Sequence, residues 1–192
     1  MKIPTPARRA LILLLVGAVG AGAQAAPAPP EPGPKVGDIA PEFSLRGATR
    51  AGLLAAPVRL SKFRGQTVVV AFFPRARTTG CTAQMTTFRD QWASLFNGGN
   101  GIHVIAISMD ADTTQANWAK QASLPMTFAS DPGGEAGKAY GAYPWREGME
   151  NRLLFVVGPD GHITYTAKPF KPLSADAYTA LGTAVKKTSE GK

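Results

Sequence analysis

The chain has 192 residues, 18% of them charged, and a formal net charge of +8 at neutral pH. Its basic residues are scattered and form no stripe with interleaved aromatic side chains, a pattern that argues against a nucleic-acid partner. The two histidines, His103 and His162, are far apart in the sequence, and neither lies in a recognisable metal-ligand spacing.

The N-terminus has the parts of a secretory signal peptide. A basic start with Lys2, Arg8 and Arg9 precedes a short apolar run at residues 10–22, and a small-x-small cleavage site ends at Ala25. The run is shorter than the roughly 20 residues that a membrane span needs, although a retained anchor is the alternative. We therefore expect a periplasmic protein that has no stable membrane insertion once the signal is cleaved.

Composition divides the rest of the chain into a linker and a domain. Residues 26–34 are rich in proline and alanine, which predicts an extended linker. Residues 35–192 have the length of one domain and contain no internal repeat. One folded domain is therefore expected after a signal peptide at residues 1–25.

Within this domain, patterns of buried strands alternate with patterns of amphipathic helices. In chain order we expect an N-terminal hairpin that includes 41–47, a strand at 66–73, a helix from about 80 to 96, a strand at 103–110, a helix at 113–123, an extended piece at 126–132, a short helix at 135–143, a hairpin at 152–167, and a helix at 174–188 capped by Ser174. The strand–helix–strand unit implies parallel strands, and the late hairpin adds antiparallel ones. This is the element order of a thioredoxin-like α/β domain, a central mixed sheet flanked by helices.

The only cysteine, Cys81, lies in the first turn of the expected helix at 80–96. Unpaired backbone N–H groups and the positive end of the helix dipole favour a thiolate at this place, and Arg75 and Arg77 add positive potential. A thiolate is both a nucleophile and a metal ligand. From position alone, an inert buried cysteine is an equal alternative.

The residues around Cys81 resemble a known motif. Pro74, Thr78 and Cys81 form P-x-x-x-T-x-x-C, which resembles the active-site motif of the peroxiredoxins, and the residues that follow resemble the branch of the bacterioferritin comigratory protein. Residues 36–45 are similar to the family's N-terminal opening, so the resemblance implies a peroxiredoxin-type N-terminal extension of the domain. Residues 151–163 are similar to the strand that carries the family's active-site arginine. The resemblance implies a thiol-dependent peroxidase for hydrogen peroxide and organic hydroperoxides that uses no metal and no organic cofactor.

The same resemblance implies a role for four residues. Cys81 would be the nucleophile that attacks the peroxide and becomes a sulfenic acid. Thr78 would direct its hydroxyl at the thiolate and the bound peroxide, and Pro74 would shield the pocket from water. Arg152 would hold the thiolate and the charge that develops as the O–O bond breaks. Without the resemblance, a solvated arginine at the end of a strand is the favoured interpretation of Arg152.

The sequence also departs from the pattern of this branch. Thr79 stands where proline is usual, Gln84 where an acidic residue is common, and Leu154 where a small hydroxyl residue is found. Thr86 takes the place of the second, resolving cysteine that many members carry. A one-cysteine enzyme is therefore expected, with an external thiol reductant, either a thioredoxin-like protein or a small thiol.

A cysteine at this place can also serve other functions. A thiol–disulfide oxidoreductase needs C-x-x-C, which is absent because residue 78 is threonine and residue 84 is glutamine. A thioredoxin-like periplasmic copper-binding protein would use Cys81 and Met85, two soft ligands at i and i+4. A non-catalytic interaction protein that has kept the fold is a third possibility.

Overall fold

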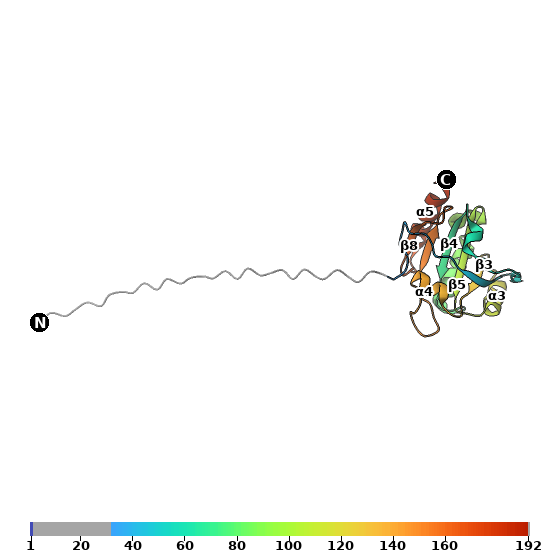
Figure 1. Ribbon diagram of the computed structural model, residues 1–192, viewed down its shortest axis with the longest axis horizontal. Coiled ribbons are helices and arrows are strands. Elements are labelled where there is room, and N and C mark those ends of the chain that lie inside the picture. The colour runs from blue at the N-terminus through green and yellow to red at the C-terminus, as the bar shows by residue number, and fades with distance from the viewer. Residues whose placement is uncertain (2–31, 192) are drawn as a thin grey trace. The chain divides into compact units, whose positions relative to one another are not determined.

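The computed structural model describes residues 32–191, besides Met1 (Figure 1). The predicted signal peptide after Met1 and the first part of the predicted linker, residues 26–31, lie outside the described residues. Within the described range, no helix combines the length and the apolar character needed to cross a membrane.

Residues 32–191 are built around one mixed sheet. Its strands are β1 (Ser44–Thr49), β2 (Gly52–Leu53), β3 (Val58–Arg59), β4 (Thr67–Phe72), β5 (Ile102–Ser108), β6 (Thr127–Ser130), β7 (Leu154–Val157) and β8 (Ile163–Ala167). The strand order is β2-β1-β6-β5-β4-β7-β8, with β3 paired to β1. Strands β4, β5 and β6 are parallel to one another, and β7 runs antiparallel to β4. The predicted mixed sheet, with its late hairpin β7–β8, is therefore confirmed.

Helices cover both faces of this sheet. They are α1 (Thr79–Asp90), α2 (Trp92–Phe96), α3 (Asp112–Gln121), α4 (Glu135–Tyr140) and α5 (Ala175–Glu190), with 3-10 turns at Leu60–Phe63 and Asn97–Gly99. Because side chains alternate along a strand, Val69 and Ala71 of β4 join one apolar cluster with α1, α2, α3 and α5. Val68 and Val70 join a second cluster with α4 and the N-terminal segment. Figure 1 shows α5 beside β8 and α3 toward the opposite edge.

Two local predictions about the helices were wrong. The helix expected at 80–96 is divided at Gln91, whose backbone (φ −104°, ψ 21°) lies outside the helical region and separates α1 from α2. The break lets α2 pack against α5 while Leu95 and Phe96 still enter the apolar cluster. Ser174 does precede α5, but its side chain makes no capping hydrogen bond.

Candidate active site

Cys81 is the third residue of α1, directly after the loop that leaves β4. Its side chain is 0% exposed and belongs to the apolar cluster that also holds Phe73 and Met85. Buried strand β4 ends at Phe72, and residues 73–78 reverse the chain into the helix. The sulfur therefore lies in the first turn, as predicted, where backbone N–H groups lack partners within the helix.

Arg152 reaches this sulfur from a distant part of the sequence. The register of the antiparallel strands pairs Ala71 of β4 with Leu154 of β7, and Phe72 N donates to Leu153 O at 2.8 Å. The residues just before β7 therefore lie beside the end of β4, where α1 begins. Arg152 Nη2 lies 3.2 Å from Cys81 Sγ.

The backbone of Arg152 is fixed on both sides. Its N–H donates to Oδ1 of Asn151 at 2.8 Å, and its carbonyl accepts from Phe170 N at 2.9 Å. The side chain is half-buried and bonded to its neighbours. The alternative of a solvated arginine at a strand end is therefore wrong.

Gln84 holds the other end of the same guanidinium. Arg152 Nη1 donates to Gln84 Oε1 at 2.5 Å, and Gln84 is fully buried. In the sequence, Gln84 stands out only as a departure from the family pattern. Its spacing of three from Cys81 is the signal that could have identified this contact, since residues i and i+3 share a helix face.

Thr78 precedes α1 directly, but its hydroxyl has another partner than the sulfur. Thr78 is the N-cap, and its carbonyl accepts from Thr82 N at 2.8 Å. Its Oγ1 donates to Arg75 O at 3.0 Å, and the side chain is exposed. Because a hydroxyl has one proton and two lone pairs, this bond leaves Oγ1 able to accept a hydrogen bond at the start of α1.

Pro74 and the loop around it are held by a carboxylate that sequence reasoning missed. Pro74 is half-buried, two residues after the end of β4. Asp110 Oδ2 accepts from Ala76 N at 2.7 Å and from Ser108 Oγ at 2.8 Å. The end of β5 therefore fixes the loop that carries Pro74. The presence of Asp110 just past a buried strand was the available sequence signal.

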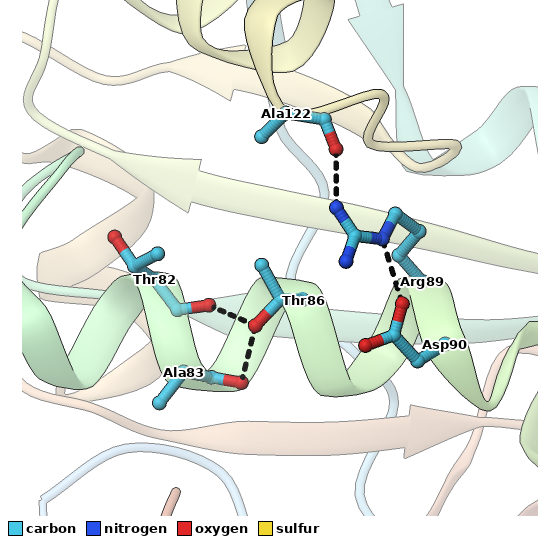
Figure 2. A network of polar contacts seen from close by, with 6 residues as sticks. All are labelled: Thr82, Ala83, Thr86, Arg89, Asp90 and Ala122. Atoms are coloured by element: carbon cyan, nitrogen blue, oxygen red, sulfur yellow. Dashed lines mark hydrogen bonds and ion pairs between the residues drawn. The ribbon is translucent and has the colours of Figure 1, made fainter.

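Thr86, at the place of the absent second cysteine, is bonded only to its own helix in Figure 2. Its Oγ1 donates to Thr82 O at 2.8 Å and to Ala83 O at 3.2 Å. One turn further along α1, Arg89 Nη1 donates to Ala122 O at 2.8 Å, which ties this helix to the end of α3. Figure 2 thus shows α1 tied to α3 near the C-terminal end of α1.

Met85, weighed above as a copper ligand, is a core residue. It is 0% exposed and packs in the same cluster as Phe88 of α1. Among residues 32–191, no three His, Cys, Asp or Glu side chains are grouped so that they could hold a metal ion.

The comparisons with known proteins agree on one family. The sequence model of the AhpC/TSA family matches residues 36–166. Peroxiredoxin Bcp of Escherichia coli strain K12 is 32% identical over 143 residues, which cover 71% of this chain and 87% of that protein. The chloroplastic peroxiredoxin Q of Sedum lineare is 41% identical over 85 residues, 44% of this chain and 45% of that protein.

A solved structure agrees in fold with these sequence matches. The crystal structure of peroxidoxin BcpB from Mycobacterium tuberculosis aligns with a TM-score of 0.65 and 27% identity, covering 79% of this chain and 96% of that one.

Proposed function

Because the chain belongs to the AhpC/TSA family, the peroxiredoxins, we propose that it reduces hydrogen peroxide and organic hydroperoxides through Cys81. Thiol-dependent peroxide reduction is the activity of this family. One observation carries the assignment of the site: a guanidinium lies 3.2 Å from a cysteine sulfur in the first turn of a helix. A fixed cation and unpaired helix N–H groups favour a thiolate there.

The reaction at Cys81 is a displacement on oxygen. The thiolate sulfur attacks one peroxide oxygen, the S–O bond forms, and the O–O bond breaks. Sulfur is oxidised to a sulfenic acid, and the other oxygen leaves with a proton as water or an alcohol. Negative charge spreads over sulfur and two oxygens, so Arg152, already in contact with the sulfur, stabilises this transition state more than the ground state.

Two further residues support the reaction. The free lone pairs of Thr78 Oγ1 accept a hydrogen bond from the peroxide and orient it toward the sulfur, since its own proton is bonded to Arg75 O. Pro74 presents no N–H and, half-buried beside the site, limits the access of water. Both roles rest on the position of these residues in the loop before α1.

An external thiol completes the cycle, since Cys81 is the only cysteine of the chain. The first thiol attacks the sulfenic sulfur and releases water, which leaves a mixed disulfide. A second thiol attacks that disulfide, restores Cys81 and leaves as the oxidised reductant. A thioredoxin-like protein or a small thiol fits this role.

We also propose that the enzyme is periplasmic. The basic start, the short apolar run at residues 10–22 and the cleavage site ending at Ala25 support this location. Expression with a C-terminal tag in a Gram-negative host, followed by fractionation, should recover a periplasmic protein that begins at Ala26. An uncleaved protein in the membrane fraction would refute the proposal.

A peroxide-consumption assay with a panel of thiol donors tests the main proposal. The wild-type protein should consume hydrogen peroxide and an organic hydroperoxide with at least one donor, and Cys81→Ser should not. If Cys81→Ser consumes peroxide as fast as the wild type, Cys81 is not the nucleophile.

A further inference from the structure

Two exposed arginines lie on the loop that leads from β4 to Cys81. They are Arg75 and Arg77, and Arg77 directly precedes Thr78, the N-cap of α1. Within residues 32–191, neither arginine forms an ion pair with a carboxylate. Their charges are therefore available to an anion that approaches the start of α1.

The backbone at Arg77 is unfavourable for an arginine. Its φ of 66° lies in the left-handed region, which glycine and asparagine adopt with less strain. The side chain is exposed, so packing in the core does not account for it. Its Nη1 donates to Gln121 Oε1 at 2.6 Å, and this neutral partner at the end of α3 leaves the positive charge and the other N–H groups free. A charged side chain kept at a strained position indicates a role for its charge.

A third surface cation lies on a different segment beside the site. A Cβ atom at Gly80 would lie 3.4 Å from Arg152 Nη2 and 4.0 Å from Pro172 Cγ, so these three residues are neighbours. Lys171 directly precedes Pro172 and is exposed. Gly80 is the residue before Cys81, and it has no side chain to cover this place. Cations from two separate segments therefore border the surface next to the nucleophile.

Carboxylates on the same segments offset this positive charge only in part. Asp110 is half-buried, and its Oδ2 accepts two hydrogen bonds from donors within the fold. Asp176, in the first turn of α5, is exposed five positions after Lys171. The three surface cations and Arg152 outnumber these two carboxylates. The electrostatic potential over the site is therefore positive, which raises the local concentration of anions and the rate at which they arrive.

The burial of Cys81 favours a small thiol over a protein as the reductant. The sulfur is 0% exposed in the first turn of α1. A small molecule can pass Gly80 with its thiol first, while a flat protein surface meets the loop before α1 and Pro172. Carboxylates on such a molecule can stay at the surface, where the fork of an arginine binds them through two parallel hydrogen bonds.

We propose that the thiol that reduces oxidised Cys81 is a small anionic thiol whose carboxylates bind Arg75 and Arg77. This inference rests on the proposed peroxidase function, and it names the class of thiol that completes the cycle. The thiolate of the reductant attacks the sulfenic sulfur, the S–S bond forms and the S–O bond breaks. Hydroxide leaves and takes up a proton as water. The reductant sulfur is oxidised and Cys81 is reduced, both to the level of a mixed disulfide.

The rate constant of mixed-disulfide formation tests this proposal apart from the reaction with peroxide. The sulfenic acid is first made with one equivalent of hydrogen peroxide, and each thiol is then added in a quenched-flow experiment. Intact mass identifies the product, and the site is known because the chain has one cysteine. The probes are mercaptosuccinate, which has two carboxylates, neutral 2-mercaptoethanol and cationic cysteamine. They are compared at equal thiolate concentration, since the thiolate is the attacking species.

We expect mercaptosuccinate to react with the wild type about tenfold faster than 2-mercaptoethanol at low ionic strength, the lower end of the range for electrostatic steering. Cysteamine should be the slowest. The advantage of the anionic thiol should shrink at about 1 M salt, where charges are screened beyond about 3 Å. Combining Arg75→Gln with Arg77→Asn should remove most of this advantage.

The matched control combines Lys186→Gln with Lys187→Gln. It removes the same charge from the last turn of α5, about 16 Å along the helix from its start. Both lysines are exposed, and this variant should keep the wild-type ratio of the rate constants for mercaptosuccinate and 2-mercaptoethanol. Because each ratio compares the same two thiols, their intrinsic reactivities cancel between variants.

A wild-type ratio in the double arginine variant, or an equal loss in the double lysine variant, would overturn the proposal. If the double arginine variant does not fold, Arg77→Asn alone decides, since asparagine suits the positive φ and an unchanged ratio contradicts a role for Arg77. The peroxidase proposal fails separately, if peroxide produces no sulfenic acid at Cys81. A sulfenic acid that reacts equally with all three thiols refutes only the anionic reductant.

Discussion

Arg152 and Cys81 are 71 positions apart in the chain, and yet the guanidinium Nη2 of one lies 3.2 Å from the sulfur of the other. The antiparallel pairing of β4 with β7 produces this contact, because it places the start of β7 beside the end of β4. The contact therefore depends on the central strands of the sheet, which are buried on both faces. A site built on such strands is held rigidly.

Replacing Arg152 should slow peroxide reduction strongly. We expect Arg152→Met to lower the rate constant of Cys81 oxidation by about 100-fold or more, the usual loss when one fixed donor to a developing charge is removed. Arg152→Lys should be intermediate, since an ammonium cannot contact Cys81 and Gln84 together. Stopped-flow kinetics with hydrogen peroxide measures both variants.

Arg89→Met is the matched control for that prediction. Arg89 is another arginine bonded to a partner outside its own strand or helix, and its Nη1 contacts Ala122 O rather than the sulfur. The Arg89→Met variant should be less stable than the wild type, but while it is folded it should keep the wild-type rate constant of Cys81 oxidation. Equal loss of rate in Arg89→Met and Arg152→Met would contradict a specific role for Arg152.

The hydroxyl of Thr78 should affect the rate at which Cys81 reacts with peroxide. Thr78→Val removes the hydroxyl, and we expect it to lower the rate constant with hydrogen peroxide about tenfold, the factor for a hydrogen bond worth about 1.4 kcal/mol. Thr78→Ser should restore the rate. Thr79→Val, at the next exposed position, is the control. If Thr78→Val retains the wild-type rate, the hydroxyl of Thr78 only stabilises the turn in which it bonds to Arg75 O.

Glu150 makes stability depend on pH. It is 0% exposed, and burial together with the neighbouring Asp131 carboxyl raises its pKa from 4.5 to about 10. A raised pKa in the folded state means that the native protein keeps a proton which the unfolded chain releases above pH about 4.5. The protonated side chain of Glu150 makes its full contribution to the free energy of unfolding below that pH. This contribution is lost progressively as the pH rises toward about 10.

Glu150→Gln should remove this dependence. The amide is neutral, like the protonated acid, so burial beside Asp131 does not penalise it as it penalises a carboxylate. We expect the variant to have a higher melting temperature than the wild type at pH 8, by about 2–4 °C for each kcal/mol gained. The difference should vanish near pH 4. A wild-type melting temperature that rises between pH 5 and pH 8 relative to Glu150→Gln would contradict the assigned protonation.

A cysteine at position 86 should convert the enzyme to an internally resolved one. In an intact helix, residues five apart are separated by about 7.5 Å along the axis. A disulfide needs Cα atoms about 5.5–6 Å apart, so Cys81 can bond to a cysteine at 86 only if α1 unwinds locally. We expect Thr86→Cys, treated with one equivalent of peroxide, to form an intramolecular disulfide with loss of helical circular dichroism.

Intact-mass analysis, with and without alkylation of free thiols, shows whether the intramolecular disulfide forms in Thr86→Cys. The control is Thr87→Cys, whose position on the helix differs by one residue. A persistent sulfenic acid in Thr86→Cys, with no disulfide, would show that α1 does not open around Cys81 on this time scale.

Local patterns in the sequence predicted the elements better than they predicted the contacts of the site. The continuous apolar run of β4 and the turn residues at 158–161 were enough for a buried strand and a hairpin. The pairing of β7 with β4, which brings Arg152 to Cys81, is a long-range contact that no local period encodes, and only the family resemblance indicated it. The break at Gln91 depends on how α2 packs against α5, which the helical spacing of the sequence does not reveal.

The residues that hold the catalytic groups in place were harder to predict than the cysteine nucleophile. Cys81 was identified from the motif around it, because its position at the start of a helix left an inert buried cysteine as an equal alternative. Gln84 and Asp110 hold Arg152 and the loop at Ala76, and their roles depend on where their side chains meet distant backbone and side-chain donors. A single sequence gives the residue types but not those partners.

The most direct test of the central claim is a single-turnover reaction without reductant, analysed by mass spectrometry in the presence of dimedone. One equivalent of hydrogen peroxide should be consumed per chain, and the dimedone adduct should be found on Cys81 alone. Peroxide that persists unreacted, with Cys81 recovered as a free thiol, would contradict the account.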